Sequence, residues 1–146
     1  MKVRFLLDEN ESPRLKVALL RLNSTIDVMR VGEPGALPLG TSDLEVLRYL
    51  ELSHRALVTS NRTSMPAHVE AHWAAGGHLW GLFWVCSGTP IGRLAQELFL
   101  VWEDSEAKEW IDRLAGFRFD VTSHLHKLSG VANNGTATTD PRDPLD

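Results

Sequence analysis

The chain opens with Val3-Arg4-Phe5-Leu6-Leu7-Asp8-Glu9-Asn10, and the rest of the chain is organised around this stretch. Four of its first five residues are apolar, and the apolar run stops at an acidic pair. A short apolar run bounded by turn signals predicts a strand, and a strand that is buried on both faces is typical of a parallel sheet. Asp8 then falls at the carboxyl end of that strand, which is the edge of an α/β sheet where ligands and catalytic groups gather.

Helical and strand patterns alternate along the rest of the chain. Ser12 followed by Pro13 is typical of a helix start, and Ser42 with Glu45 forms the capping-box pattern of another helix. We expect strands over 3–7, 25–31, 56–59 and 79–85, helices over 13–22, 42–52, 66–75, 91–102 and 105–114, and a short edge strand over 117–119.

This alternation predicts an α/β fold: a three-layer α/β/α, Rossmann-like sandwich with a mainly parallel sheet of four or five strands and right-handed crossovers. From about Ser129 the chain consists largely of Gly, Asn, Thr, Asp and Pro, a composition typical of disorder. We therefore expect one folded domain over residues 1–128 and a disordered tail over 129–146.

Composition excludes several classes of protein. The net charge of −4 argues against a protein that coats nucleic acid non-specifically, because phosphate contacts need clustered Lys and Arg. The single Cys86 cannot form an internal disulfide, which favours a reducing compartment. No secretory signal and no membrane-spanning apolar run is visible. We expect a soluble cytoplasmic protein with no membrane association.

Three polar residues are expected to meet at one sheet edge. Asp8 follows the first strand, Asn61 follows the third, and Asp43 lies in the first turn of the helix after the second. Oxygen ligands converging there suit Mg²⁺ or Mn²⁺, and such an ion can activate a water for attack on a phosphodiester. Each residue also has a structural interpretation, as a strand-end, first-turn or turn residue respectively.

Three motifs resemble, in order and spacing, the PIN-like family of small bacterial proteins: Leu6–Asn10 with Ser12-Pro13, Ser42–Glu45, and Leu57–Arg62. This family is grouped with the toxin-type ribonucleases of toxin–antitoxin pairs. The resemblance covers about residues 1–85 and implies a Rossmann-like sandwich with an acidic, Mg²⁺-dependent site that cuts single-stranded RNA. It also implies an antitoxin protein as a partner.

The resemblance assigns roles to four residues. Asp8 and Asp43 would hold the metal, Asn61 would complete its shell or orient a water, and Arg62 would contact the phosphate. The family's third motif carries Asp where this chain has Asn61 and Thr63. Because fewer carboxylates weaken the binding of hard cations, a second interpretation stays open. In it, the chain is a degenerate PIN-like module that binds a protein or RNA partner without cleaving it. A third is a structural homo-oligomer.

Two other patterns are weaker. His68 and His72 have the spacing of a shared zinc ligand pair, but Glu70 does not directly follow the first histidine as the zinc-protease motif requires. Gly88-Thr89 precedes a helix as an anion site could, although helix capping is the simpler interpretation. Trp80 and Trp84 are expected on one face of the fourth strand.

Overall fold

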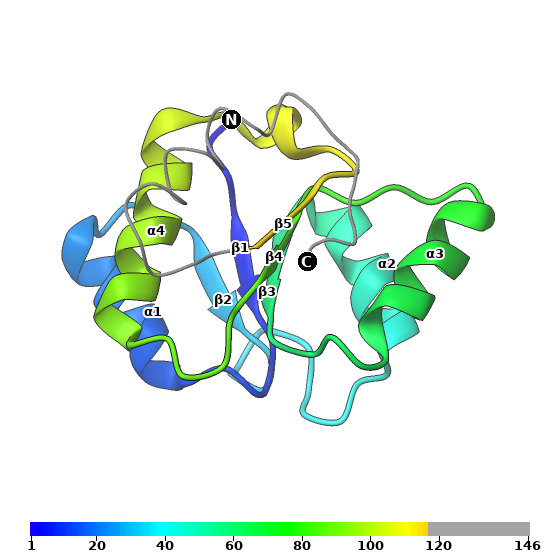
Figure 1. Ribbon diagram of the computed structural model, residues 1–146, viewed down its shortest axis with the longest axis horizontal. Coiled ribbons are helices and arrows are strands. Elements are labelled where there is room, and N and C mark those ends of the chain that lie inside the picture. The colour runs from blue at the N-terminus through cyan, green and yellow to red at the C-terminus, as the bar shows by residue number, and fades with distance from the viewer. Residues whose placement is uncertain (117–146) are drawn as a thin grey trace.

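Five parallel strands form one sheet in the order β2-β1-β3-β4-β5 in the computed structural model, which describes residues 1–116 (Figure 1). The strands are β1 (Phe5–Leu7), β2 (Val28–Arg30), β3 (Ala56–Thr59), β4 (Leu82–Trp84) and β5 (Leu114–Gly116). The expected strand over 117–119 and the expected tail over 129–146 lie outside the described residues.

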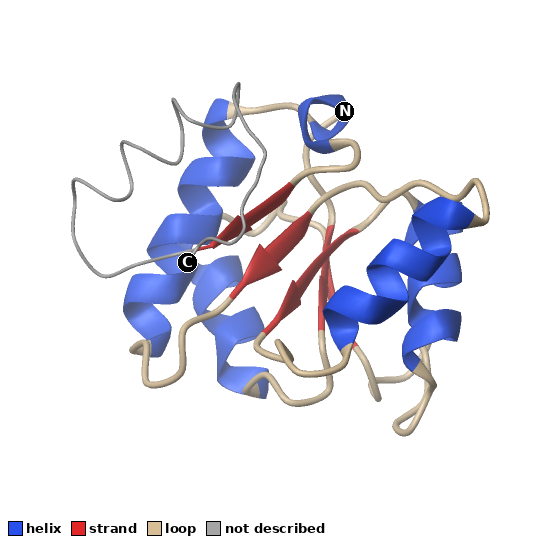
Figure 2. Cartoon of the chain, turned by 45° about the vertical axis from the view of Figure 1, so that its right-hand side comes forward, coloured by secondary structure: helices blue, strands red, loops and turns tan. Residues whose placement is uncertain are grey.

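Helices cover both faces of the sheet (Figures 1 and 2). On one face lie α1 (Pro13–Leu22) and α4 (Ile91–Asp104), and on the other lie α2 (Asp43–Ser53) and α3 (Met65–Ala74). The predicted three-layer α/β/α sandwich is therefore confirmed. None of the helices within residues 1–116 has the length and apolarity to cross a membrane.

The sequence of β1 explains its place inside the sheet. Successive side chains of a strand point to opposite faces. Phe5 and Leu7 pack into the core beneath α1 and α4, whereas Leu6 packs into the core beneath α2 and α3. All three side chains are 0% exposed. A strand that faces two cores favours apolar side chains on both faces, and the apolar run Phe5-Leu6-Leu7 follows from that.

Side-chain caps fix the two helices that border the candidate site. The Ser12 hydroxyl accepts a hydrogen bond from the backbone N–H of Arg14, with Pro13 at the first helical position of α1. The Ser42 hydroxyl accepts one from the backbone N–H of Glu45 at the start of α2. Both predicted helix starts are confirmed, and each satisfies an N–H group that the helix itself leaves unpaired.

The helix expected over 105–114 is wrong. The chain instead forms a short 3₁₀ helix at Ala107–Trp110 and then enters β5. Between them Asp112 takes the left-handed conformation, with φ of 58°. Its Oδ1 accepts hydrogen bonds of 2.8 Å from the indole N–H of Trp73 and from the backbone N–H of Leu79. These tertiary contacts follow the 3₁₀ helix and prevent a longer helix. No local sequence pattern indicates them.

The expected strand over 79–85 is shorter than predicted, because Gly81 takes a positive φ of 112° just before β4. Trp80 therefore lies outside the strand and stacks on the ring of His54, with 4.1 Å between ring centroids. The expected pairing of Trp80 with Trp84 on one strand face is wrong.

The β4–α4–β5 crossover departs from the expected handedness. The steps from β2 to β3, β3 to β4 and β4 to β5 all run in the same direction across the sheet, opposite to the step from β1 to β2. The first two of these steps pass through α2 and α3, but the last passes through α4 on the face of α1 (Figure 1). The β4–α4–β5 crossover therefore has the opposite hand to the other three crossovers of the sheet. Because nearly all such crossovers are right-handed, we assign the right hand to those three and the left hand to β4–α4–β5. The loop after β4 consequently lies beside the start of α1.

Candidate functional site

Asp8 lies at the carboxyl end of β1, beside the last residue of β3. Its Oδ2 accepts a hydrogen bond of 2.7 Å from the Thr59 hydroxyl, and its Oδ1 accepts one of 2.8 Å from the backbone N–H of Glu9. The parallel register, which pairs Leu7 with Val58, brings Asp8 and Thr59 together. Asp8 is 9% exposed and Thr59 is fully buried, so the carboxylate is held in one orientation at the edge of the sheet.

Asn61 and Asp43 are joined through Ser64. The Ser64 hydroxyl donates to Oδ2 of Asp43 over 3.0 Å and accepts from Nδ2 of Asn61 over 2.9 Å. The backbone N–H of Ser64 donates to Oδ1 of Asn61 over 3.2 Å. The backbone N–H of Asn61 in turn donates to the Thr59 hydroxyl over 3.0 Å. One hydrogen-bonded series, which we call the edge network, therefore runs from Asp8 through Thr59, Asn61 and Ser64 to Asp43.

The edge network lies at the point where the chain reverses its direction across the sheet. From β1 the chain passes to β2 on one side, and it later returns to β3 on the other side. In open α/β sheets a crevice forms at the carboxyl ends of the strands at such a switch point, and ligands bind there. Three of the four predicted site residues, Asp8, Asp43 and Asn61, thus belong to one hydrogen-bonded series at this edge, with Thr59 between Asp8 and Asn61 and Ser64 between Asn61 and Asp43.

Arg62, the fourth predicted site residue, lies apart from the two carboxylates. Its guanidinium lies over the Trp84 ring, 5.2 Å from the ring centroid, near the carboxyl ends of β4 and β5. Within residues 1–116 it forms no ion pair with Asp8 or Asp43. Arg62 is exposed, so a phosphate on the β4 side of the edge could reach it.

Glu9 and Arg30 shape the loops around the edge. Oε1 of Glu9 accepts a hydrogen bond of 2.8 Å from the backbone N–H of Gly40, which ties the loop before α2 to the end of β1. The Arg30 guanidinium donates to the backbone oxygens of Glu9 and Glu11. These contacts fix the backbone that carries Asp8 without using its carboxylate.

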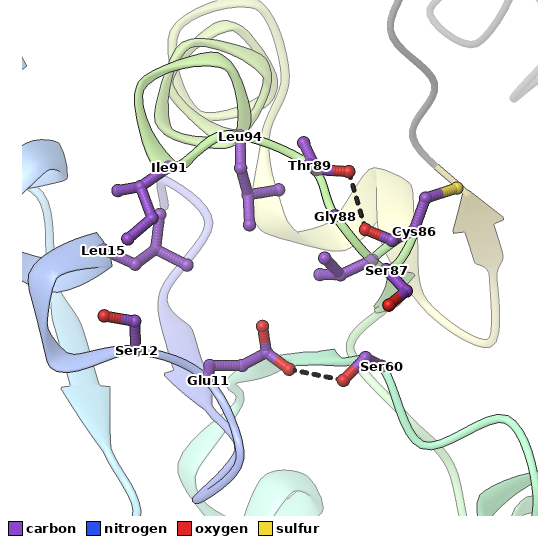
Figure 3. A pocket seen from close by; sticks show the side chains of 11 residues that line it. Glu11, Ser12, Leu15, Ser60, Cys86, Ser87, Gly88, Thr89, Ile91 and Leu94 are labelled. Carbon is purple, nitrogen blue, oxygen red and sulfur yellow. Dashed lines mark hydrogen bonds between the residues drawn. The ribbon is translucent and has the colours of Figure 1, made fainter.

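Glu11 is a further polar residue at this edge, and no sequence pattern marks it. It lies between β1 and α1, is 7% exposed, and lines a pocket of about 230 Å³ with the loop after β4 (Figure 3). Its Oε2 accepts a hydrogen bond of 3.0 Å from the Ser60 hydroxyl. Burial, together with the charge of Asp8, raises the pKa of the Glu11 carboxyl even though Ser60 opposes the shift. A position four residues past a strand carries no burial signal, because the pocket forms only when α4 packs beside α1.

The edge network offers a modest set of metal ligands. It contains two carboxylates and one amide oxygen, and a carboxylate oxygen that accepts one hydrogen bond still has capacity for a second partner. In the described part of the chain, no group of three His, Cys, Asp or Glu side chains is arranged to hold a metal ion. Mg²⁺ is usually bound through one or two carboxylates and several waters. Asp8 and Asp43 have the chemistry of such a pair.

The histidine pair does not act as a unit. Nε2 of His68 lies 3.7 Å from Oδ2 of Asp43, whereas Nε2 of His72 lies 2.9 Å from Oε1 of Glu51 and 3.2 Å from the backbone oxygen of His78. The two rings have different partners, and no observation favours the zinc interpretation. His68 instead borders the edge network.

Capping of α4 by Thr89, which the sequence favours, does not occur. Pro90 occupies the N-cap position and forms no side-chain cap, while the Thr89 hydroxyl donates to the backbone oxygen of Cys86 over 2.7 Å. The first turn of α4 therefore begins at the pocket without a side-chain cap.

Comparisons with models of protein families, with curated proteins and with solved structures find no match to this chain. Functional inference therefore rests on the residues at the carboxyl edge of the sheet.

Proposed function

We propose that the protein is a PIN-like, toxin-type ribonuclease that cleaves single-stranded RNA with the help of Mg²⁺ or Mn²⁺. The observation that supports this proposal most is the edge network, which joins the two predicted carboxylates at the switch point of the sheet through the buried Thr59, the half-buried Asn61 and the exposed Ser64. A purely structural strand end would not need a polar connection between Asp8 and Asp43.

In this proposal Asp8 and Asp43 hold the divalent ion. Thr59 and Ser64 orient the two carboxylates, and Asn61 either adds its amide oxygen or positions a water. The ion, when bound, supplies an activated water and neutralises charge that develops on the phosphodiester. Arg62 is placed to meet a phosphate on the β4 side. The protein acts in the cytoplasm, with an antitoxin protein as its partner.

A second candidate function is a degenerate PIN-like module that binds a protein or RNA partner without cleavage. It is favoured by the contacts of Asn61, whose amide oxygen already accepts the N–H of Ser64 and brings no charge. A homo-oligomer is compatible with either function.

Cleavage of a labelled single-stranded RNA, with and without Mn²⁺, distinguishes these functions. The ribonuclease proposal predicts metal-dependent cleavage by the wild type and none by Asp8→Asn, which keeps the shape of the side chain. A matched control, Asp104→Asn, changes an exposed acid at the far end of α4 and should cleave like the wild type. Equal activity of Asp8→Asn and wild type would rule out the site assignment. Metal-independent RNA binding without cleavage would favour the second function.

Asn61→Asp tests the third position of the site. If Asn61 belongs to the metal shell, a carboxylate there adds charge and should strengthen Mn²⁺ binding. Unchanged Mn²⁺ affinity would remove Asn61 from the shell and leave it as the residue that holds Ser64.

A further inference from the structure

The pocket beside the edge network has a polar side and, across from it, an aliphatic wall. Its polar side is formed by Glu11, Ser60 and the loop after β4, and the side chains of Leu15, Ile91 and Leu94 lie across from them (Figure 3). The volume of about 230 Å³ is below the roughly 300–1,000 Å³ of pockets for drug-sized ligands, so it suits one small ring.

Glu11 has one carboxylate oxygen to spare. Oε2 is engaged with the Ser60 hydroxyl, while Oε1 points into the open space of the pocket toward the aliphatic wall (Figure 3). The side chain is more than nine-tenths buried, and no cation pairs with its carboxylate among residues 1–116. Ser60 donates to this carboxyl, and a further donor at Oε1 would offset more of the cost of burying it. The pocket therefore suits a ligand with a hydrogen-bond donor.

The charges around the pocket favour a neutral ligand. Both α1 and α4 begin at the pocket, and helix N-termini carry positive partial charge, which disfavours a cation. The Glu11 carboxyl disfavours an anion. A neutral ring with donors and acceptors on its edge satisfies both, since its flat faces can contact Leu15 and Leu94.

The sulfur of Cys86 does not contribute, because it points away from the pocket (Figure 3). The hydroxyl of Thr89 is used within its own turn. Glu11 is therefore the charged residue of the pocket lining, beside the hydroxyls of Ser12, Ser60 and Ser87.

We propose that this pocket binds one nucleobase of the RNA strand, a base with an exocyclic amino group, and that the Glu11 carboxylate accepts a hydrogen bond from that amino group. Carboxylates make this contact with the amino group of cytosine. The inference rests on the proposed function for its substrate, and it adds a base preference to it. The pocket adjoins the edge network, because Ser60 lies between Thr59 and Asn61 in the chain.

The test compares CMP with UMP as probes of the full chain without divalent ions. The two nucleotides share their sugar and phosphate, and only CMP carries an amino group on the base. Backbone amide NMR spectra should show saturable shifts at Glu11, Ser60 and the residues of the loop after β4. CMP should bind about tenfold more tightly than UMP, the discrimination expected of one good base-edge contact.

Glu11→Gln probes the recognition without removing bulk. It replaces the carboxylate with an amide that both donates and accepts, so the preference for CMP over UMP should fall to near unity. Glu70→Gln, which makes the same chemical change at an exposed position of α3, is the matched control and should keep the preference for CMP. No saturable shift at the pocket, equal affinity for the two nucleotides, or an unchanged preference in Glu11→Gln would overturn the inference.

Failure of this inference can be told apart from failure of the proposed function. Metal-dependent RNA cleavage without a pocket that prefers CMP contradicts only the base site. A CMP preference without metal-dependent cleavage supports the base site and contradicts only the ribonuclease.

Discussion

Thr59 is the residue on which the edge network depends. Its hydroxyl donates to Asp8 and accepts from the N–H of Asn61, and the side chain is fully buried. No other side chain in the network contacts both the β1 carboxylate and the turn that carries Asn61. The position of the network between two strand ends therefore depends on one hydroxyl group.

Thr59→Val should destabilise the protein by about 1–3 kcal/mol, because the isosteric side chain leaves a buried oxygen of Asp8 and the N–H of Asn61 without that partner. Urea unfolding measures the loss. The control Thr63→Val makes the same chemical change at an exposed turn position and should leave the free energy of unfolding within about 0.5 kcal/mol. Equal effects of the two variants would contradict the structural role of the Thr59 hydroxyl.

Glu11 gives the protein a pH-dependent stability. Burial raises its pKa in the folded state above the ordinary value of 4.5. Between pH 4.5 and the folded-state pKa of Glu11, the folded state binds more protons than the unfolded state. The free energy of unfolding therefore falls as the pH rises through that window. The contribution is fully present below pH 4.5 and is lost above the folded-state pKa.

Glu11→Gln removes this titration. The free energy of unfolding of the wild type, measured relative to Glu11→Gln, should decrease as pH increases from about 4 to about 7. Chemical denaturation at several pH values provides the comparison, with Glu70→Gln on the exposed face of α3 as the control. A difference between wild type and Glu11→Gln that stays constant with pH would show that Glu11 does not titrate as its burial requires.

The positions of some site residues could be predicted from the sequence and those of others could not, for a physical reason. Asp8, Asn61 and Asp43 follow strands or open a helix, and the carboxyl ends of parallel strands meet by construction. Their placement at the carboxyl edge of the sheet could be predicted. Glu11 could not, because its burial depends on the packing of α4 beside α1. The direction of the Arg62 side chain depends on Trp84, which follows it by more than twenty positions.

At the scale of the elements, local signals placed the helices that carry their own caps. Ser12 with Pro13 and Ser42 with Glu45 act within a few residues, so the starts of α1 and α2 could be predicted. The turn at Asp112 could not be predicted, since its partners belong to α3 and to the segment before β4. Neither Gly nor Pro marks this break in the sequence between Ser105 and Leu114.

Asp112 should therefore stabilise the junction of α3, β4 and β5. Burial raises its pKa, but the N–H of Leu79 and the side chains of His78 and Trp73 outweigh burial and hold the pKa of the Asp112 carboxyl below its usual value. Asp112→Ala loses these hydrogen-bond partners. It also leaves an alanine, which no side-chain hydrogen bond supports, in the left-handed backbone conformation. The expected loss is about 3 kcal/mol in urea unfolding.

Asp112→Asn provides the matched comparison. Asn tolerates the left-handed conformation and keeps one oxygen that can accept from Trp73 and Leu79, so it should lose clearly less stability than Asp112→Ala. Identical losses for the two variants would show that the charge toward His78, rather than the hydrogen bonds and the backbone conformation, dominates at this turn.

At the scale of the whole molecule, the alternation of helix and strand predicted the layers but not the strand order. Hydrophobic periodicity indicates which segments are buried. It does not indicate on which side of β1 a later strand pairs. The order β2-β1-β3-β4-β5 creates the switch point at Asp8 and Thr59. The left-handed β4–α4–β5 crossover then brings the loop after β4 next to Glu11 and closes the pocket.

We propose that the edge network binds a divalent ion through Asp8 and Asp43. Thermal unfolding of the wild type and of Asp8→Asn across a Mn²⁺ titration tests it most directly. A ligand that binds only the folded state adds about 2.7 kcal/mol at a hundredfold excess over its dissociation constant, which corresponds to a rise in Tm of roughly 5 to 10 °C. We predict this rise for the wild type and none for Asp8→Asn. Equal rises in both proteins, or no rise in the wild type, would contradict the claim.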